Sequence, residues 1–99
     1  MALSDQDVRA LVIKSTRRKL LETLRLLYPA RVPFYHVRAI MADVEADHLK
    51  VDASYLVDKG LATRVNERGN QLWDEREFRL TAEGVEVADR IVADPALEP

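Results

Sequence analysis

The segment from Tyr35 to Thr81 constrains the fold more than any other part of the chain, because the spacing of its apolar residues changes along it. Its centre reads "MADVEADHLKVDASYLVDKGLATRV". The apolar spacing is helical, is interrupted by a short turn, becomes helical again and then changes to strand-like alternation around a polar loop. This order predicts two helices followed by a β-hairpin. A second helix that the first holds at an angle offers one of its faces to a binding partner.

The second of these helices is predicted to run from Glu45 to Lys59. Leu49, Ala53 and Leu56 recur with helical spacing and should face the core. Gly60 should end the helix as the left-handed residue that follows the C-cap. The outward face then carries Asp47, His48, Val51, Ser54, Tyr55 and Asp58.

The first helix of the pair is predicted over about Phe34–Met41, and Pro33 suits its first turn. Asp43 occupies the turn between the helices, where we expect left-handed backbone, which Asp tolerates better than most residues. Val44 should fill the angle between the two helices.

Strands are predicted at Leu61–Val65 and Arg76–Leu80, on either side of the polar loop "NERGNQLWDE". Thr81 is a suitable N-cap for a last helix. We expect Pro95 to stop this helix, whose apolar positions are Val85, Ala88, Ile91 and Val92.

The N-terminal segment should be helical from Asp5, because Ser4 and Asp7 form a capping-box pattern. Its two apolar stripes, 8–12 and 20–28, point roughly 165° apart on a continuous helix. The chain either breaks near Ser15–Thr16, or one long helix packs its second half on its own core and its first half on a partner. A homodimer through this helix is therefore a hypothesis.

The 99 residues fit a single domain over 1–94 with a flexible tail at 95–99. The absence of cysteine excludes disulfides and thiolate metal sites and favours a reducing compartment. No apolar run approaches the ~20 residues of a membrane span, and the N-terminus is unlike a secretory leader. We expect a cytoplasmic protein without membrane contact.

Charge is unevenly spread over the chain. Residues 1–42 carry eight basic and three acidic side chains, whereas residues 80–99 carry one basic and five acidic side chains. This polarity is compatible with orientation on DNA or with a complementary protein surface.

Catalysis is not expected, because the chain lacks a nucleophile–base pattern and a phosphate-binding glycine loop. His36 and His48 lack metal-ligand spacing, so we predict no metal and no cofactor.

Two motifs carry a family resemblance: "DVEADHLKVDASYLVDKGLA" and "FRLTAEG". They hold the patterns L-x-x-x-G-L and L-T-x-x-G. From about Ser15 to Val92 the chain resembles the winged helix-turn-helix superfamily, in particular small bacterial regulators of the MarR, PadR and ArsR kinds. The resemblance implies an α+β, mainly helical fold with a three-helix core, a β-hairpin wing, and N-terminal and C-terminal helices.

The resemblance also implies a DNA-binding transcriptional regulator, with the N-terminal helix as its dimer contact. Helix 45–59 would enter the major groove and the wing at 64–78 would contact the backbone. The implied contact residues are Asp47, His48, Lys50, Val51, Ser54 and Tyr55 on the helix, and Arg64, Arg68, Asn70 and Arg76 on the wing.

The reading helix departs from the family pattern, because it is acidic where the family usually places polar or basic residues. Carboxylates close to phosphates weaken DNA binding, although Asp can accept from a cytosine amino group. The alternative is a winged-helix protein-interaction module that uses Val51 and Tyr55 as its contact surface. A regulator with a ligand pocket between the N-terminal helices ranks third.

Two further features leave alternatives open. A second basic patch of Arg17, Arg18, Lys19 and Arg38 is either a phosphate contact or a solvated face. A continuous positive band that joins this patch to the wing arginines would favour DNA. Trp73 is either a contact anchor on the wing or a cover for the sheet edge, and we favour the cover.

Overall fold

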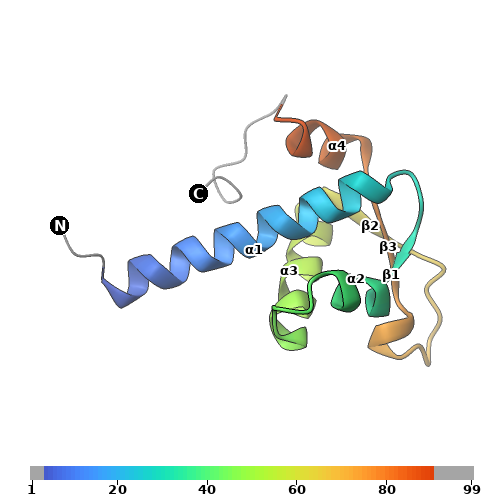
Figure 1. The fold of residues 1–99 in the computed structure, drawn as a ribbon. Coiled ribbons are helices and arrows are strands. Elements are labelled where there is room, and N and C mark those ends of the chain that lie inside the picture. Colours follow the sequence, from blue (N-terminus) through green and yellow to red (C-terminus); the bar gives the residue numbers. More distant parts are fainter. Residues whose placement is uncertain (1–3, 91–99) are drawn as a thin grey trace.

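A computed structural model describes residues 4–90, within which four α-helices, three short strands and one 3-10 turn occur. The chain is mainly helical with a small antiparallel sheet, which confirms the α+β class. Ile91, Val92, Pro95 and the predicted tail lie outside the described residues. The element order is α1 (Asp5–Leu27), β1 (Val32–Pro33), α2 (Phe34–Ile40), α3 (Ala46–Asp58), β2 (Ala62–Val65), η1 (Trp73–Glu75), β3 (Glu77–Leu80) and α4 (Ala82–Ala88) (Figure 1).

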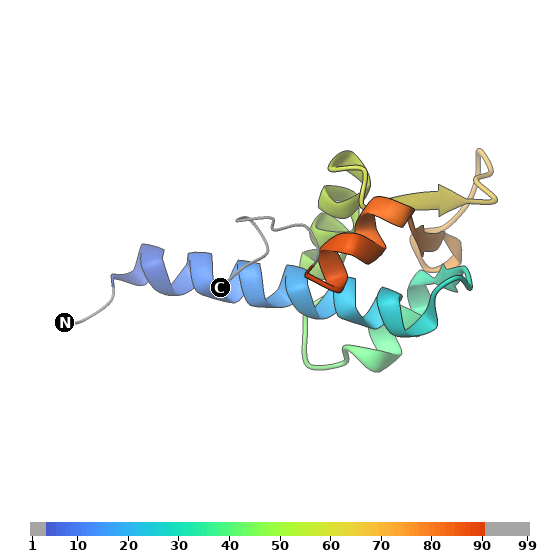
Figure 2. The same cartoon turned by 90° about the horizontal axis from the view of Figure 1, so that it is seen from above.

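The N-terminal segment is one continuous helix, which settles the alternative that the sequence left open. Its capping box is formed: the Asp7 amide donates to the Ser4 hydroxyl (3.1 Å), and the Ser4 amide donates to the Asp7 carboxylate (3.3 Å). The second half of α1 packs into the core, and α4 lies across it (Figure 2). The first half extends beyond the rest of the described chain (Figures 1 and 2).

The two helices α2 and α3 lie within a residue or two of their predicted bounds, and Val44 packs against the core between them. The prediction of left-handed backbone at Asp43 is wrong, because its φ is not positive. The Val44 amide donates to the Met41 carbonyl (3.0 Å), so a hydrogen-bonded turn reverses the chain without a left-handed residue.

The end of α3 confirms the role predicted for Gly60, whose φ is +75°. The Gly60 amide donates to the Val57 carbonyl (3.0 Å), and the Leu61 amide donates to the Leu56 carbonyl (2.9 Å). These two bonds form a Schellman motif, and the buried side chains of Leu56 and Leu61 supply its usual apolar contact.

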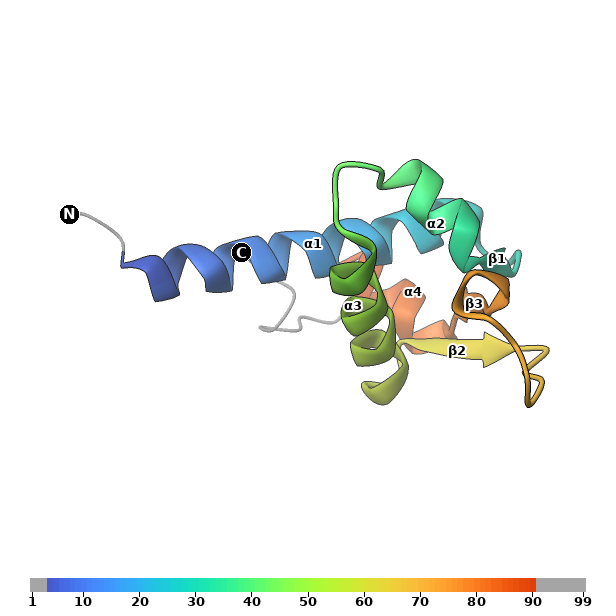
Figure 3. The ribbon, with the colours of Figure 1, turned by 90° about the horizontal axis from the view of Figure 1, so that it is seen from below.

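The sheet has the strand order β1-β3-β2, and both pairs are antiparallel (Figure 3). The two-residue strand β1 was not predicted, because Val32–Pro33 is too short to show alternation. Across β2 and β3, Arg64 lies opposite Phe78. Directly opposed residues share a face, so Arg64 points to the same side of the sheet as the buried Phe78.

Thr81 caps α4 as predicted, since the Gly84 amide donates to its hydroxyl (3.0 Å). The Thr81 hydroxyl in turn donates to the Gly60 carbonyl (2.7 Å). The start of α4 is thereby tied to the end of α3. The helix ends at Ala88, earlier than the predicted stop at Pro95, and Arg90 after it has a positive φ of +61°.

Candidate nucleic-acid interface

The outer face of α3 is acidic and apolar rather than basic. The Asp47 side chain is 90% exposed and Val51 is 63% exposed, and both lie on the predicted reading face. Lys50 is half-buried beside them, and its Nζ is 3.7 Å from the Asp47 carboxylate. Ser54 is half-buried, whereas His48 is exposed. This face offers hydrogen-bond acceptors and a methyl surface, but little positive charge.

Tyr55 is not on the exposed face, contrary to the prediction. Its half-buried ring packs against the core, and the guanidinium carbon of Arg17 from α1 lies 3.7 Å from the ring centroid. Such a stacked cation leaves little of the ring for a partner. Tyr55 therefore joins α3 to α1, and the exposed apolar side chain of α3 is Val51 alone.

Asp52 is one of the carboxylates that make the sequence of α3 acidic, but its side chain is buried and lies 3.7 Å from Arg17 Nε. Burial raises the pKa of Asp52 to about 6, and the charges of Arg17 and His48 oppose that rise only in part. A sequence signal for its burial existed. Asp52 lies between Leu49 and Leu56 at helical spacing, on the stripe that was predicted to face inward.

The loop between β2 and β3 brings three of the predicted contact residues together. Arg64, Arg68 and Arg76 line one open hollow of about 330 Å³, which we call the arginine hollow. Each guanidinium has a neighbour: Arg64 Nη1 is 3.5 Å from Glu67, Arg68 Nη2 is 3.7 Å from Glu75, and Arg76 lies 4.5 Å from the Trp73 ring centroid. Asn70 is exposed in the same loop. Glu67 also lines the hollow and Glu75 lies beside Arg68, so these carboxylates offset part of the positive charge that the three arginines bring together.

Trp73 packs against core aromatic residues, but it does so on Phe78 of the central strand β3 and not at the sheet edge that the sequence interpretation favoured. Its ring centroid is 5.2 Å from Phe34 in an edge-to-face contact and 6.2 Å from Phe78 in a stacked one. The half-buried indole fixes the loop to α2 and β3. Arg76, which lies over the indole, is thereby held at the arginine hollow.

The second basic patch does not extend the arginine hollow into a continuous positive band. Lys19 Nζ is 3.3 Å from Asp43, and Arg38 Nη1 is 2.8 Å from Asp74. Arg17 is engaged with α3, as described above. Carboxylates thus accompany each exposed cation of the predicted patch and reduce its field.

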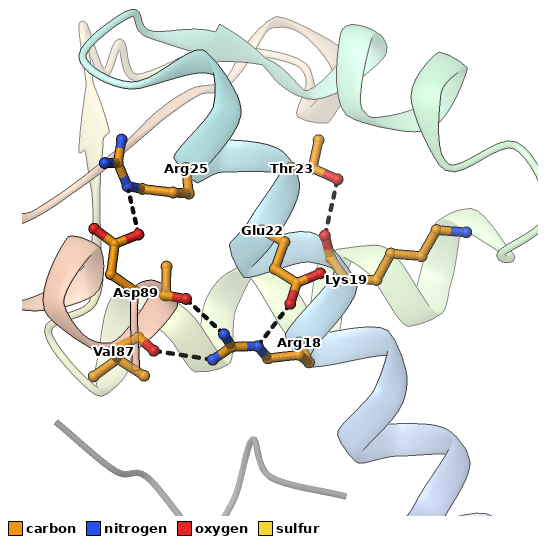
Figure 4. A network of polar contacts seen from close by, with 8 residues as sticks. Arg18, Lys19, Glu22, Thr23, Arg25, Val87 and Asp89 are labelled. Carbon is orange, nitrogen blue, oxygen red and sulfur yellow. Dashed lines mark hydrogen bonds and ion pairs between the residues drawn. The ribbon is translucent and has the colours of Figure 1, made fainter. Parts of the chain in front are cut away.

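Arg18 is a structural residue and not part of an exposed face, contrary to the expectation of a surface patch. It is buried against the last turn of α4, where Nη1 donates to the Val87 carbonyl (2.9 Å) and Nη2 to the Ala88 carbonyl (2.6 Å) (Figure 4). Its Nε donates to Glu22 (2.9 Å). The guanidinium therefore satisfies the terminal carbonyls of α4 and is unavailable to DNA.

A second hollow of about 540 Å³ lies between the projecting half of α1 and α3, and we call it the α1–α3 groove. The apolar stripe on the first half of α1 is visible in the sequence, whereas the opposite wall that α3 forms was not predicted. Its main lining residues are Val8, Val12 and Ile13 from α1, and His48, Val51 and Asp52 from α3.

Comparisons of the chain with protein-family models, curated proteins and solved structures gave no match. Within residues 4–90, no helix has both the length and the apolar character that a membrane span requires. The same residues contain no cluster of three or more potential metal ligands among His, Cys, Asp and Glu.

Proposed function

We propose that this chain is a winged-helix protein that binds double-stranded DNA and regulates transcription. Two features support the proposal. The helices α2 and α3 follow each other in helix-turn-helix order, and the β2–β3 hairpin lies beside them as a wing would. The observation that carries the proposal is the arginine hollow, where three cations from the hairpin and its loop meet at one open surface.

The wing arginines supply most of the proposed affinity. Exposed ion pairs are worth only about 0–1 kcal/mol, so a DNA phosphate can replace Glu67 or Glu75 at little cost. Arginine binds phosphate oxygens through a planar fork of donors, which suits a backbone contact. Each phosphate bound in this way releases condensed counterions and makes the affinity depend on salt.

We propose that α3 contacts base edges in the DNA but contributes little electrostatic attraction to the phosphates. Asp47 can accept from a cytosine amino group, and Val51 can contact a thymine methyl group. Because carboxylates on this helix are repelled by phosphates, we propose that α3 adds sequence preference and that the wing adds affinity. Tyr55 is left out of this role, since Arg17 covers its ring.

The experiment is a fluorescence-anisotropy titration of a mixed-sequence duplex with the wild type, Arg68→Gln and Arg25→Gln. Arg68 is 71% exposed at the hollow, whereas Arg25 is an ion-paired arginine on α1 that contacts Asp89 of α4. At roughly 50 mM salt, Arg68→Gln should weaken binding about three- to tenfold and Arg25→Gln should not. Equal effects of the two substitutions, or no wild-type binding, would contradict the proposal.

A second candidate function is recognition of a protein in place of DNA. The observation that favours it is the exposed Val51 on the acidic outer face that includes Asp47 and Asp58. This surface is complementary to a protein that carries Lys or Arg side chains around an apolar pocket.

One substitution separates the two functions. Asp47→Asn removes a carboxylate that repels phosphate, so it should strengthen DNA binding. The same change removes an attraction to a basic protein surface, so it should weaken protein binding. Retention of a protein partner that is lost with both Asp47→Asn and Val51→Asp would favour the second candidate.

A further inference from the structure

We propose that Gln71 is a positioning residue of the arginine hollow. Its side-chain amide links the two limbs of the β2–β3 loop, and this link holds the arginines of the hollow in place before a phosphate arrives. The link itself is independent of the DNA-binding proposal, whereas its effect on affinity rests on that proposed function. Gln71 is not among the contact residues that the sequence predicted.

The arginines of the hollow lie on two limbs of one long loop. Strand β2 ends at Val65, and strand β3 begins at Glu77. Arg64 and Arg68 belong to the limb that leaves β2, and Arg76 belongs to the limb that enters β3. Each unrestrained residue of such a loop keeps backbone freedom that binding would have to remove. A contact between the limbs is therefore needed if the three guanidinium groups are to converge on one surface.

Gln71 provides such a contact from near the tip of the loop. Its Nε2 donates to the Glu75 carbonyl (3.0 Å), and Glu75 directly precedes Arg76. The same Nε2 donates to the Asn66 carbonyl (3.5 Å) on the other limb. One side-chain amide nitrogen carries two donors, so both bonds can form at once. The Gln71 backbone amide also donates to the Arg68 carbonyl (3.3 Å), so this residue is bonded to both limbs close to the arginines.

The bases of both limbs are fixed by other contacts. Asn66 has a left-handed φ of +56°, which Asn tolerates, and its Nδ2 donates to the Glu77 carboxylate (3.1 Å). The Arg76 carbonyl accepts from the Phe34 amide of α2 (2.8 Å). Loss of the Gln71 amide should therefore loosen the outer part of the loop and leave the sheet and the core intact.

An ion pair between the limbs does not survive phosphate binding. Arg68 Nη2 is 3.7 Å from Glu75, and the two side chains are 71% and 49% exposed. The proposed phosphate contact takes the place of this carboxylate. The Gln71 amide still joins the limbs at that point, because it is bonded to backbone carbonyls that a phosphate does not replace. Groups that are ordered beforehand lose less conformational entropy on binding, so Gln71 should raise the affinity through the arginines.

The first arm of the test measures DNA affinity. Gln71→Met keeps the length of the side chain and removes its donors without a change in charge. At roughly 50 mM salt it should weaken binding to the mixed-sequence duplex about three- to tenfold. Gln6→Met is the matched control, because Gln6 is exposed on α1 and does not line the hollow. Circular dichroism confirms that both variants are folded.

A double-mutant cycle shows whether Gln71 acts through the arginines. In the Arg68→Gln background, Gln71→Met should weaken binding less than about twofold, because the loop then has one guanidinium fewer to position. A loss of stability unrelated to the arginines would reduce the affinity equally in both backgrounds.

The second arm uses the protein without DNA. Backbone amide relaxation measured by NMR at residues 67–70 should give order parameters of about 0.85 in the wild type and below about 0.6 in Gln71→Met. An equally ordered loop in the two proteins would overturn the proposal, whatever the DNA affinity.

The outcomes separate this proposal from the proposed function. A wild type that binds no DNA contradicts the proposed function, and the order parameters then decide alone whether Gln71 holds the limbs together. If the wild type binds DNA, unchanged affinity of Gln71→Met, or an equal loss in the Arg68→Gln background, would overturn the positioning role.

Discussion

The backbone carbonyl oxygen of Leu61 occupies the space that a Cβ atom on Gly84 would need. The same oxygen accepts a hydrogen bond from the Thr81 amide (3.0 Å). Leu61 follows the glycine that ends α3, and Gly84 lies in the first turn of α4. The two sequence motifs L-x-x-x-G-L and L-T-x-x-G therefore meet in one contact, which fixes α4 against the end of α3.

Gly84→Ala should destabilise the protein, because α4 must move away from the Leu61 backbone. Overpacking against a rigid neighbour costs about 1–3 kcal/mol, which exceeds the gain in helix propensity. Urea unfolding measures the effect. Gly69→Ala is the control, since a Cβ at Gly69 meets open space. Equal stability of the two variants would contradict this account of the contact.

Thr81→Val should lower the free energy of unfolding by about 1–2 kcal/mol, the usual worth of an N-cap. The substitution keeps the shape of the side chain but removes the acceptor for the Gly84 amide and the donor to the Gly60 carbonyl. Thr63→Val is the control, because the Thr63 hydroxyl makes only a long contact of 3.4 Å to the Arg64 carbonyl. Chemical denaturation gives the free energy of unfolding of both variants. Equal values would show that the contacts of the Thr81 hydroxyl do not stabilise the fold.

Arg18→Met should destabilise the protein by about 2 kcal/mol or more, because two buried carbonyls at the end of α4 lose their donors. Arg25→Met removes an exposed pair with Asp89 and should cost under about 1 kcal/mol. Thermal and urea unfolding give both values. If Arg18→Met were as mild as Arg25→Met, Arg18 would not secure α4.

Asp52 should make stability fall as pH rises from about 4 to about 6. Burial raises its folded-state pKa to about 6 from 3.8, so the folded protein binds the proton more tightly than the unfolded chain in this window. The contribution of Asp52 to the free energy of unfolding declines by at most about 3 kcal/mol over this pH range, and it does not change further at higher pH.

Asp52→Asn removes that titration, so its stability relative to wild type should increase between pH 4 and pH 7. Asp47→Asn is the control, because the Asp47 side chain is 90% exposed. Urea unfolding at several pH values gives the curves. Parallel curves for wild type and Asp52→Asn would show that Asp52 titrates alike in the folded and unfolded states.

Local signals in the sequence predicted most of the elements. The capping residues Ser4 and Thr81 act through neighbours three residues away, and Gly60 ends α3 through bonds within one turn. Such contacts join residues that are close in the sequence, so the spacing of residue types predicts them. The apolar stripe of α3 likewise placed Leu49 and Leu56 in the core.

The misjudged residues have partners that are distant in the sequence. Arg18 sits in a basic run that is typical of a solvated face, yet its carbonyl partners are 69 and 70 residues away. Tyr55 was predicted to be exposed because nothing near it in sequence shows that Arg17 of α1 covers its ring. The strand β1 is defined only by its pairing with β3.

The measurement that tests the central claim most directly is the salt dependence of wild-type binding to duplex DNA. Three phosphates held by the wing arginines predict a slope of log affinity against log salt between about −2 and −3. Binding that is insensitive to salt, or no binding at about 50 mM salt, would contradict the proposal that the arginine hollow holds the DNA backbone.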